Sequence, residues 1–397
     1  MAVLGDYISI KHGYAFKGDG ITTEDNGVVL VTPGNFAIGG GFKEGKCKFF
    51  VDEYPSEYIL SPDDLIVTMT DLSKEIDTLG YSALVPESDR VYLHNQRIGL
   101  ISINSEDLDK HYLYWFMRTR NYQRTIAGGA SGTTVHHTSP GRICEVEVDF
   151  PDLLTQKQIA GLLDDIEGKM RQNEEINDNL LQQAQAIYIH IFGDNPSVTA
   201  ATIADIALNV TDGVHNTVKD DPEGQYLLLS CKNIKGGLLS IGSSERKINS
   251  ETFEKLRRRT KLAKGDILIS SVGTVGELLL LNTDPSNYEF QRSVAIVKPN
   301  PELVSSAYVY EYLVAKKAEL INAAHGAVQQ CLFISDIAGF PIGIPNPAEL
   351  RSFDEVVKPV FDTITANEAE NLRLETLRDT LLPKLMSGEF DVSDIDL

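Results

Sequence analysis

The chain has 397 residues, a formal net charge of -21 at pH 7, and a composition that is 42% hydrophobic and 23% charged. These values indicate a soluble globular protein with room for two ordinary domains, and no apolar run approaches the roughly 20 residues of a membrane span. The acidic balance argues against DNA binding through a generally basic surface, because phosphate neutralisation needs local lysine and arginine. A DNA-binding protein of this composition would need basic loops on an acidic body, or a partner that contacts the phosphates.

The N-terminal sequence Met-Ala-Val-Leu-Gly-Asp lacks the basic and apolar regions of a signal peptide. The four cysteines lie far apart and form no Cys-x-x-Cys pair, so neither a zinc site nor a disulfide framework is indicated. We therefore expect a cytoplasmic protein that has no contact with membranes, no metal and no other cofactor.

In chain order, the first predicted module contains short strand-like runs such as "DLIVTMT" and "RIGLISI", separated by Gly, Asp, Asn and Pro turns. One helical segment, 109–124, carries a Tyr-x-Tyr pair. A second module repeats this pattern with "DILISSV", "SVAIVK" and a helical segment at 305–324, and several further matches follow in the same order. The chain is therefore an internal repeat of two similar β-rich α/β (α+β) modules.

A long helix is predicted after each module. Thr155 followed by Gln158 indicates a capping box at the start of the first helix, and Gly193 suits its C-terminal cap. Pro359 should kink the second helix or mark its start. The predicted boundaries are 1–153 and 194–347 for the modules, 154–193 and 348–388 for the helices, and 389–397 for an acidic C-terminal tail, with a turn-like linker at 194–198.

Both helices carry the same seven-residue repeat, which reads apolar, apolar, Asn, apolar, apolar. The two sets are Ile159, Ile166, Asn173, Leu180 and Ile187, and Phe353, Val360, Asn367, Leu374 and Leu381. This repeat predicts a coiled coil in which one core asparagine per helix fixes the register at some cost in stability. A parallel pair would also align the asparagines, and both could instead face solvent on ordinary amphipathic helices.

We favour an antiparallel pair, because two-fold pseudo-symmetry then places the modules at opposite ends. Asn173 would meet Asn367, and each amide would satisfy the other. The 38 residues 155–192 would span roughly 57 Å as a helix. A rigid spacer of this kind suits two modules that read one extended object, such as duplex DNA, at a fixed separation.

Signatures of catalysis are absent from the sequence. There is no Gly-x4-Gly-Lys-[Ser/Thr] phosphate loop and no His-Glu-x-x-His. "SPDDL" (61–65) begins like a nuclease carboxylate motif, but the completing Glu-x-Lys does not follow. His136 and His137 are adjacent, and such a pair in a loop is more often structural than metal-binding. We expect no catalytic centre and no metal site.

Together these features resemble the specificity (S) subunit of type I restriction–modification enzymes, over essentially the whole chain. The most specific motif is the closing "TLLPKLMSGEFDVS" (380–393). The segments "LLTQKQIAGLLDDI" (153–166), "KGDILISSVGTVG" (264–276) and "QRSVAIV" (291–297) are also similar to that family. One departure is "SPDDLIVTMTDLSKEID" (61–77), where the Gly-rich turn of the second module is replaced.

The resemblance implies a non-catalytic DNA-recognition subunit. Its modules would be target-recognition domains, each reading one half of a bipartite site in double-stranded DNA. The helices would set the gap between the halves and dock two methyltransferase (M) subunits, and restriction (R) subunits would join the larger complex. Two alternatives stay open: a coiled-coil scaffold that binds proteins but not DNA, and a stand-alone nuclease with an unrecognised site.

Direct reading of bases needs hydrogen-bond donors and acceptors on loops that reach base edges. The candidates lie in equivalent turns of the two modules, "KHGYAFK" (11–17) and "TDGVHNT" (211–217), and in the segments around two aligned asparagines. Two aligned arginines could contact phosphate or form structural salt bridges. The DNA-binding candidates are Lys11, His12, Tyr14, Lys17, Asn35, Arg97, His215, Asn216, Lys232, Asn233 and Arg292.

Two further groups have competing interpretations. The pairs Tyr112/Tyr114 and Tyr308/Tyr310 are expected in the domain cores rather than stacked on DNA. The basic segment "KLRRRTKLAK" (255–264) is either a DNA-facing patch or a solvated turn beside an acidic surface.

Overall fold

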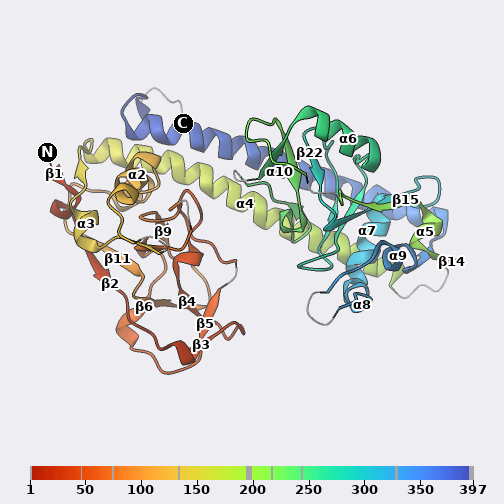
Figure 1. The fold of residues 1–397 in the computed structure, drawn as a ribbon, viewed down its shortest axis with the longest axis horizontal. Helices are drawn as coiled ribbons and strands as arrows, with labels where there is room; N and C mark the ends of the chain where they lie inside the picture. The colour runs from red at the N-terminus through yellow and green to blue at the C-terminus, as the bar shows by residue number, and fades with distance from the viewer. Residues whose placement is uncertain are drawn as a thin grey trace. The chain divides into compact units, whose positions relative to one another are not determined.

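The computed structural model describes residues 2–45, 47–73, 76–132, 135–193, 199–215, 218–242, 245–326 and 330–392. The chain divides into two compact units. Unit 1 comprises Met1–Met170 and Leu372–Leu397, and unit 2 comprises Arg171–Asn371. Each unit holds one β-rich module together with a stretch of both long helices, α4 (Leu153–Phe192) and α10 (Pro347–Met386), drawn in yellow-green and blue in Figure 1. The predicted fold class is confirmed.

Two sheets form the module of unit 1, and side chains from both sheets pack into one hydrophobic cluster. One sheet has the antiparallel order β2 (Ile8–His12), β11 (Ile98–Ile103), β7 (Leu65–Thr68), β9 (Ser82–Leu84). The other has the order β3 (Ile21–Thr22), β5 (Lys48–Phe50), β4 (Val28–Val31), β10 (Val91–His94), β6 (Ile59–Leu60). Strand β7 is apolar on both faces because Leu65 and Val67 pack into one hydrophobic cluster while Ile66 packs into another.

Shorter elements complete unit 1. They are β1 (Ala2–Val3) paired with β13 (Glu147–Val148), β8 (Thr70–Asp71) paired with β12 (His136–His137), and the helices α1 (Lys110–Phe116), α2 (Arg120–Gly128) and α3 (Pro140–Cys144). The Tyr-x-Tyr pair lies on α1, where Tyr112 is 1% exposed and Tyr114 is 4% exposed. The prediction that these tyrosines belong to the core is confirmed.

Unit 2 repeats this architecture. Its antiparallel sheet has the order β15 (Ala207–Asp212), β23 (Val294–Pro299), β20 (Ile267–Ser270), β21 (Leu278–Leu280), which corresponds strand for strand to β2, β11, β7, β9. A parallel pair, β16 (Tyr226–Leu229) with β22 (Tyr288–Phe290), corresponds to the parallel pair β4 with β10. The predicted internal repeat is thus present in the strand pairing as well as in the sequence.

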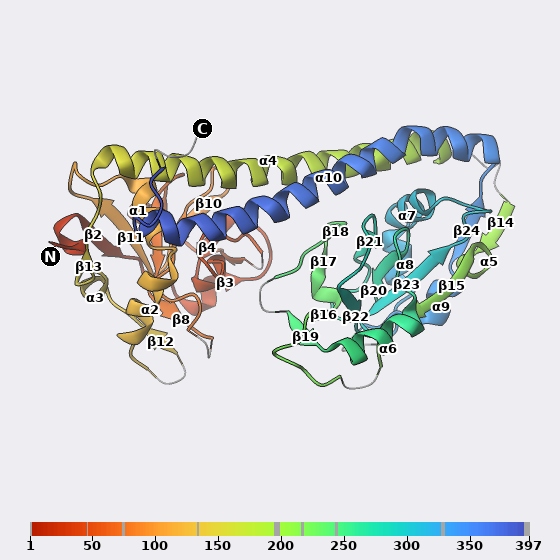
Figure 2. The same ribbon diagram turned by 90° about the horizontal axis from the view of Figure 1, so that it is seen from above.

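The remaining elements of unit 2 include β19 (Arg246–Ile248), which pairs antiparallel with β16 in the same sheet, and further elements around the sheets (Figure 2). The others are β14 (Thr199–Thr202) with β24 (Pro341–Ile344), β17 (Ile234–Lys235) with β18 (Leu238–Leu239), and the helices α5 (Ile203–Ile206), α6 (Ser250–Thr260), α7 (Ser306–Ala315), α8 (Lys317–Asn322) and α9 (Ile334–Ala338). Tyr308 and Tyr310 on α7 are buried like their counterparts on α1. Helix α6 stands where unit 1 has only the short turn 56–58.

The long helices pair antiparallel within each unit, as predicted. In unit 2, Asn173 contacts Asn371 while Tyr188, further along α4, packs against Phe353, nearer the start of α10. In unit 1, Ile159 shares a hydrophobic cluster with Leu385. Residues further along α4 therefore contact residues nearer the start of α10. The apolar positions of the repeat are buried or partly buried.

The asparagine contacts differ from the prediction. Asn173 is fully buried, and its Nδ2 donates to Glu370 Oε2 at 2.7 Å and to Asn371 Oδ1 at 2.8 Å. Asn367 Nδ2 donates to Asn177 Oδ1 at 2.8 Å. The direct Asn173–Asn367 pair is thus replaced by two equivalent pairs, each shifted by one helical turn. The reason is that a heptad repeat has two inward-facing positions, spaced alternately three and four residues apart. In an antiparallel pair, the first of these positions in one helix packs against the second in the partner helix.

The helix ends also correct two expectations. The first helix begins at Leu153, and the carboxylate of Asp152 caps it by accepting from the backbone N–H groups of Leu154 and Thr155 at 3.0 and 3.2 Å. Thr155 is therefore inside the helix rather than its cap. Helix α10 begins at Pro347 and continues through Pro359, which does not mark its start. The linker 194–198 and tail residues 393–397 lie outside the described residues.

Unit 1 replaces the missing Gly-rich turn with a carboxylate. Buried Asp71 accepts hydrogen bonds from the backbone N–H groups of Thr78 at 2.7 Å and Leu79 at 3.1 Å. In unit 2 the corresponding turn uses Gly273 and Gly276, both with φ near +85°, a region that favours glycine. Across the described ranges, no helix is long and apolar enough to cross a membrane.

Candidate nucleic-acid interface

In unit 1, a turn at Gly13 brings the candidate segment 11–14 beside the turn that carries Arg97. After β2, Gly13 N–H donates to Ile98 O at 3.3 Å and Tyr14 N–H donates to His94 O at 2.8 Å. Gln96 N–H donates back to Tyr14 O at 2.9 Å. A Cβ at position 13 would come within 2.1 Å of Asn95 O, so this close approach requires glycine. The sequence segment 11–14 therefore lies against the turn that carries Arg97.

Unit 2 repeats this construction. Gly213 N–H donates to Val294 O, Val214 N–H donates to Phe290 O, and Arg292 N–H donates to Val214 O, each at 3.1 Å. A Cβ at position 213 would come within 2.1 Å of Phe290 O. The structure thus joins the segment around His215 to the turn that carries Arg292. Of all the candidates, these two turn pairs are the ones that the fold brings together.

The surface of the unit 1 turn pair is cationic and aromatic. Lys11 Nζ lies 4.6 Å from the centroid of the Tyr58 ring and donates to Glu57 O at 3.3 Å. Tyr14 is 40% exposed, and its ring packs against those of Phe16 and Tyr58 with centroids 5.1 and 5.3 Å apart. These contacts hold the ammonium group of Lys11 and the ring of Tyr14 in place. Both side chains can therefore donate hydrogen bonds to phosphate or base edges with little loss of side-chain entropy.

Histidines at this surface have different environments. His12 is exposed at the end of β2. Beneath the surface, His94 is 1% exposed, and burial lowers the pKa of its imidazole, with Nε2 2.9 Å from Ile98 O. His94 therefore supports the turn, whereas His12 and Lys17 are exposed.

Arg97 and Arg292 are both exposed. Within the described ranges, neither guanidinium has a hydrogen bond or an ion pair to another side chain. The structural salt bridge that the sequence left open is therefore not formed there. An exposed, unengaged guanidinium on a fixed turn is suited to contact phosphate or to bind a guanine edge through two hydrogen bonds.

The unit 2 turn pair is anchored by a residue that the sequence did not single out. Arg259 of α6 donates from Nη2 to Asp212 Oδ1 at 2.8 Å and from Nη1 to Gly213 O at 2.9 Å. The other oxygen of Asp212 lies 2.6 Å from His215 Nε2. The signal for this anchor was the basic segment 255–264, which could not be assigned without the fold.

That basic segment divides into two roles. Arg257 is directed inward, where it pairs with the fully buried carboxylate of Glu289 and donates to Tyr288 O at 2.9 Å. Lys255 and Arg258 are exposed, on the face of α6 opposite the buried Phe253. Part of the segment is therefore a structural anchor, and part is a solvent-facing basic surface near the second turn pair.

Two candidates, Asn35 and Asn233, do not hold as surface contacts. Asn35 and Asn233 are 2% and 1% exposed, and each closes a turn by accepting a backbone N–H three residues earlier, from Thr32 at 2.8 Å and from Ser230 at 2.9 Å. Their amide groups donate to backbone carbonyls, so these asparagines are structural. Lys232 is exposed, its Nζ lies 3.0 Å from Glu245 Oε2, and its contact with DNA stays a prediction. Asn216 lies outside the described residues.

The histidine pair is also structural in its contacts. His136 and His137 form strand β12, and His137 Nδ1 lies 3.0 Å from Thr70 Oγ1. In the part of the chain that the structure describes, there is no group of three or more His, Cys, Asp or Glu side chains placed to hold a metal ion.

Comparisons with known proteins agree with this architecture. Residues 2–182 match the model of the type I restriction modification DNA specificity domain. The type I restriction enzyme EcoBI specificity subunit of Escherichia coli is 23% identical over 96% of this chain and 84% of its own length. The MjaIX specificity subunit of Methanocaldococcus jannaschii is 24% identical over 74% of this chain and 72% of its own length.

A solved structure has the same fold. The type I restriction–modification system S subunit from M. genitalium matches with a TM-score of 0.55 and 16% identity, covering 96% of this chain and 94% of its own. The matched domain, the relatives along most of the chain, and two modules that each carry the same glycine turn agree with one another. Residues 2–182 thus match the type I restriction modification DNA specificity domain, and most of the chain is similar to type I restriction enzyme specificity subunits.

Proposed function

We propose that this chain is the DNA-specificity subunit of a type I restriction–modification complex, in which each module reads one half of a bipartite site in double-stranded DNA. The paired helices would set the gap between the two halves and dock two methyltransferase subunits, with restriction subunits joining the larger complex. In this proposal the chain supplies recognition, and the chemistry belongs to its partners.

The observation that carries the proposal is the repeated turn pair. A glycine in close backbone contact, Gly13 or Gly213, holds each first segment against a turn whose arginine is exposed. Two equivalent recognition surfaces in one chain suit a site with two halves. Because the modules are diverged copies rather than identical ones, we expect the two halves to differ in sequence.

The proposed contacts divide by chemistry. Arg97 and Arg292 are assigned to phosphate or guanine, while Lys11, His12 and Tyr14 in unit 1 and His215 in unit 2 are assigned to base edges or sugar. Lys17 and the exposed Lys255 and Arg258 add positive charge near the DNA. The chain as a whole remains acidic, so we propose that the methyltransferase subunits contribute much of the phosphate contact.

Exchange of the first module tests the proposal. Residues 1–150 are replaced by the corresponding module of a relative with a known site, and the methylated sequence is mapped after assembly with methyltransferase subunits. We expect one half of the site to change and the other half and the gap to stay. A change in both halves, or in neither, would contradict it.

A footprint separates this function from a protein-only scaffold. With methyltransferase subunits present, the complex should protect two short segments flanking an unprotected or sequence-independent gap, and protection should weaken steeply with salt. A complex that assembles on the helices but gives the same affinity for every DNA sequence would favour the scaffold.

A further inference from the structure

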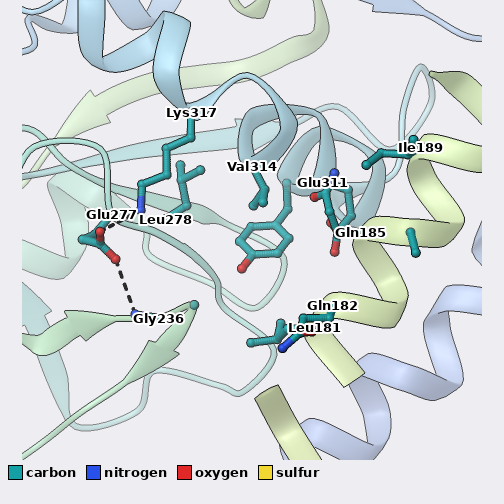
Figure 3. A pocket seen from close by; sticks show the side chains of 13 residues that line it. Leu181, Gln182, Gln185, Ile189, Gly236, Glu277, Leu278, Glu311, Val314 and Lys317 are labelled. Carbon is teal, nitrogen blue, oxygen red and sulfur yellow. Dashed lines mark hydrogen bonds and ion pairs between the residues drawn. The ribbon is translucent and has the colours of Figure 1, made fainter. Parts of the chain in front are cut away.

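Unit 2 contains a cavity beside the long helix α4. It has a volume of about 410 Å³ and lies between α4, the β17–β18 turn and α7 (Figure 3). That volume is within the range of small-ligand sites. Leu181, Ile189, Leu278 and Val314 give it an apolar lining, and exposed Gln182 and Ile189 lie on its rim, so the cavity opens to solvent.

Two buried polar groups in the lining lack partners. Glu311 is 1% exposed, and its Oε1 accepts no hydrogen bond from any described residue. The amide of Gln185 on α4 has both its nitrogen and its oxygen buried, again without a partner in the described part of the chain. An unpaired buried polar group costs roughly 1–3 kcal/mol, so these groups point to a bound species that completes them.

Unit 1 shows what fills the corresponding space. Arg118 lies four residues after Tyr114, as Val314 lies four residues after the aligned Tyr310. Arg118 Nε donates to Gly39 O at 2.9 Å and Nη1 donates to Glu167 Oε1 at 2.9 Å. Its guanidinium lies over the ring of Trp115, with the carbon Cζ 4.2 Å from the centroid. In unit 1 a guanidinium is therefore sandwiched between an aromatic ring, a carbonyl and a carboxylate.

Unit 2 has lost both large groups at these positions. Val314 replaces the arginine, and Glu311 replaces the tryptophan that immediately follows the shared tyrosine. Unit 2 still has a glycine turn against the shared tyrosine. A Cβ at Gly237 would lie 2.7 Å from the phenol oxygen of Tyr310, so this close approach requires glycine. The shape that held an internal arginine is thus retained as a cavity, and a buried carboxyl now faces it.

We propose that this cavity binds an alkylguanidinium cation, which takes the place that Arg118 occupies in unit 1. The cation would donate hydrogen bonds to Glu311 and to the amide oxygen of Gln185, while its stem packs on Val314 and Leu181. The remaining charged pair of the lining is already matched, since Glu277 Oε1 lies 2.7 Å from Lys317 Nζ and Oε2 accepts from Gly236 N–H at 3.4 Å.

Ionisation of Glu311 should make cation binding to the cavity depend on pH. Burial raises the pKa of Glu311 to about 8, so in the empty cavity the carboxyl is mostly protonated at neutral pH. A guanidinium does not titrate in this range and binds the ionised carboxylate. Binding should therefore tighten by about tenfold or more between pH 6.5 and 8.5. The neighbouring groups are Tyr188 and Tyr310, whose pKa values burial raises, and the Glu277–Lys317 pair.

Calorimetric titration with N-ethylguanidinium, with N-ethylurea as the neutral isostere, tests the proposal on the whole chain. We expect saturable binding of the cation only, tightening with pH as stated. Glu311→Gln should abolish binding, whereas Glu302→Gln, an exposed carboxylate outside the cavity, should leave it unchanged. Equal binding by wild type and Glu311→Gln, or equal binding of urea and guanidinium, would overturn the proposal.

A second variant fills the site from within. Val314→Arg should restore the internal guanidinium, raise the melting temperature and eliminate N-ethylguanidinium binding. Retained binding in a folded Val314→Arg protein would place the ligand elsewhere and refute the assignment. If this variant fails to fold, the Glu311→Gln comparison and the pH dependence still decide.

The source of the cation is settled by a separate measurement, which rests on the proposed function. Assembly with methyltransferase subunits is followed with and without saturating N-ethylguanidinium. Competition assigns the site to an arginine side chain of the partner, and undiminished assembly assigns it to a free small cation. The calorimetric result does not depend on the partner, so failure of the cation site and failure of the DNA-recognition role are distinguishable.

Discussion

The register of the helix pair can be tested by double-mutant cycles on its asparagines. In unit 2, Asn367 Nδ2 donates to Asn177 Oδ1 at 2.8 Å, and Asn177 is 1% exposed. Asn177→Ala removes the acceptor and leaves a half-buried amide without it, which should cost about 1–3 kcal/mol of unfolding free energy. The single change Asn367→Ala should cost a similar amount for the same reason.

The informative quantity is the coupling energy. One neutral amide–amide hydrogen bond contributes about 1 kcal/mol net, so Asn177→Ala and Asn367→Ala together should cost about 1 kcal/mol less than the sum of the single changes. The matched control is the cycle of Asn173 with Asn367, which occupy equivalent positions but donate to different partners. Its coupling should stay within roughly 0.5 kcal/mol.

Urea unfolding of the whole chain supplies the measurement, read from the transition that the single variants shift, with midpoint and slope fitted separately. Negligible coupling of Asn177 with Asn367, or a larger coupling of Asn173 with Asn367, would refute the antiparallel register of the structure. The second result would restore the direct asparagine pair that the sequence alone suggested.

Three further predictions address the interface, the cavity and the core. Arg97→Ala and Arg292→Ala should each weaken DNA binding by the assembled complex. A lost phosphate contact should lower the slope of log affinity against log salt concentration by about 0.9. An unchanged slope together with a relaxed sequence preference would indicate a base contact instead. Burial raises the pKa of Glu311 in the folded protein to about 8, so its contribution to folding stability is fully present below its unfolded pKa and is lost as pH rises through the folded pKa. Between about pH 5 and 8, the unfolding free energy of wild type should therefore fall relative to that of Glu311→Gln by on the order of 1 kcal/mol per pH unit. Parallel stability profiles of the two proteins would contradict this. Arg257→Met should destabilise unit 2 by about 3–5 kcal/mol in urea unfolding, since it strands the buried Glu289 carboxylate; a loss below 1 kcal/mol would show that Glu289 finds another partner.

Much of the candidate interface was visible in the sequence because the chain contains two copies of it. Alignment of the copies marked the turns that carry Arg97 and Arg292 and the segments around Tyr14 and His215. The same alignment also marked Asn35 and Asn233, which the fold uses to close buried turns. Similarity between copies identifies positions that matter to both, but a turn-closing asparagine and a DNA-facing one have the same signature.

Arg259 shows the opposite limit. Its residue type was noticed within a basic segment, yet only the packing of α6 brings it to Asp212 and Gly213. The neighbouring Arg257 is directed into the core instead. Helical geometry separates residues two positions apart onto different faces, and which face meets the core depends on sheets formed by residues distant in sequence.

The sequence by itself determined the repeat, the two long helices and their apolar seam, because hydrophobic periodicity and self-similarity are properties of the chain alone. Tertiary structure decided the shift of one turn in the asparagine pairs, the burial of Asn35 and Asn233, and the cavity where Val314 and Glu311 replace an arginine and a tryptophan. Each of these depends on which groups from separate segments meet in space and whether they leave a donor, an acceptor or a volume unfilled, and no local pattern contains that information.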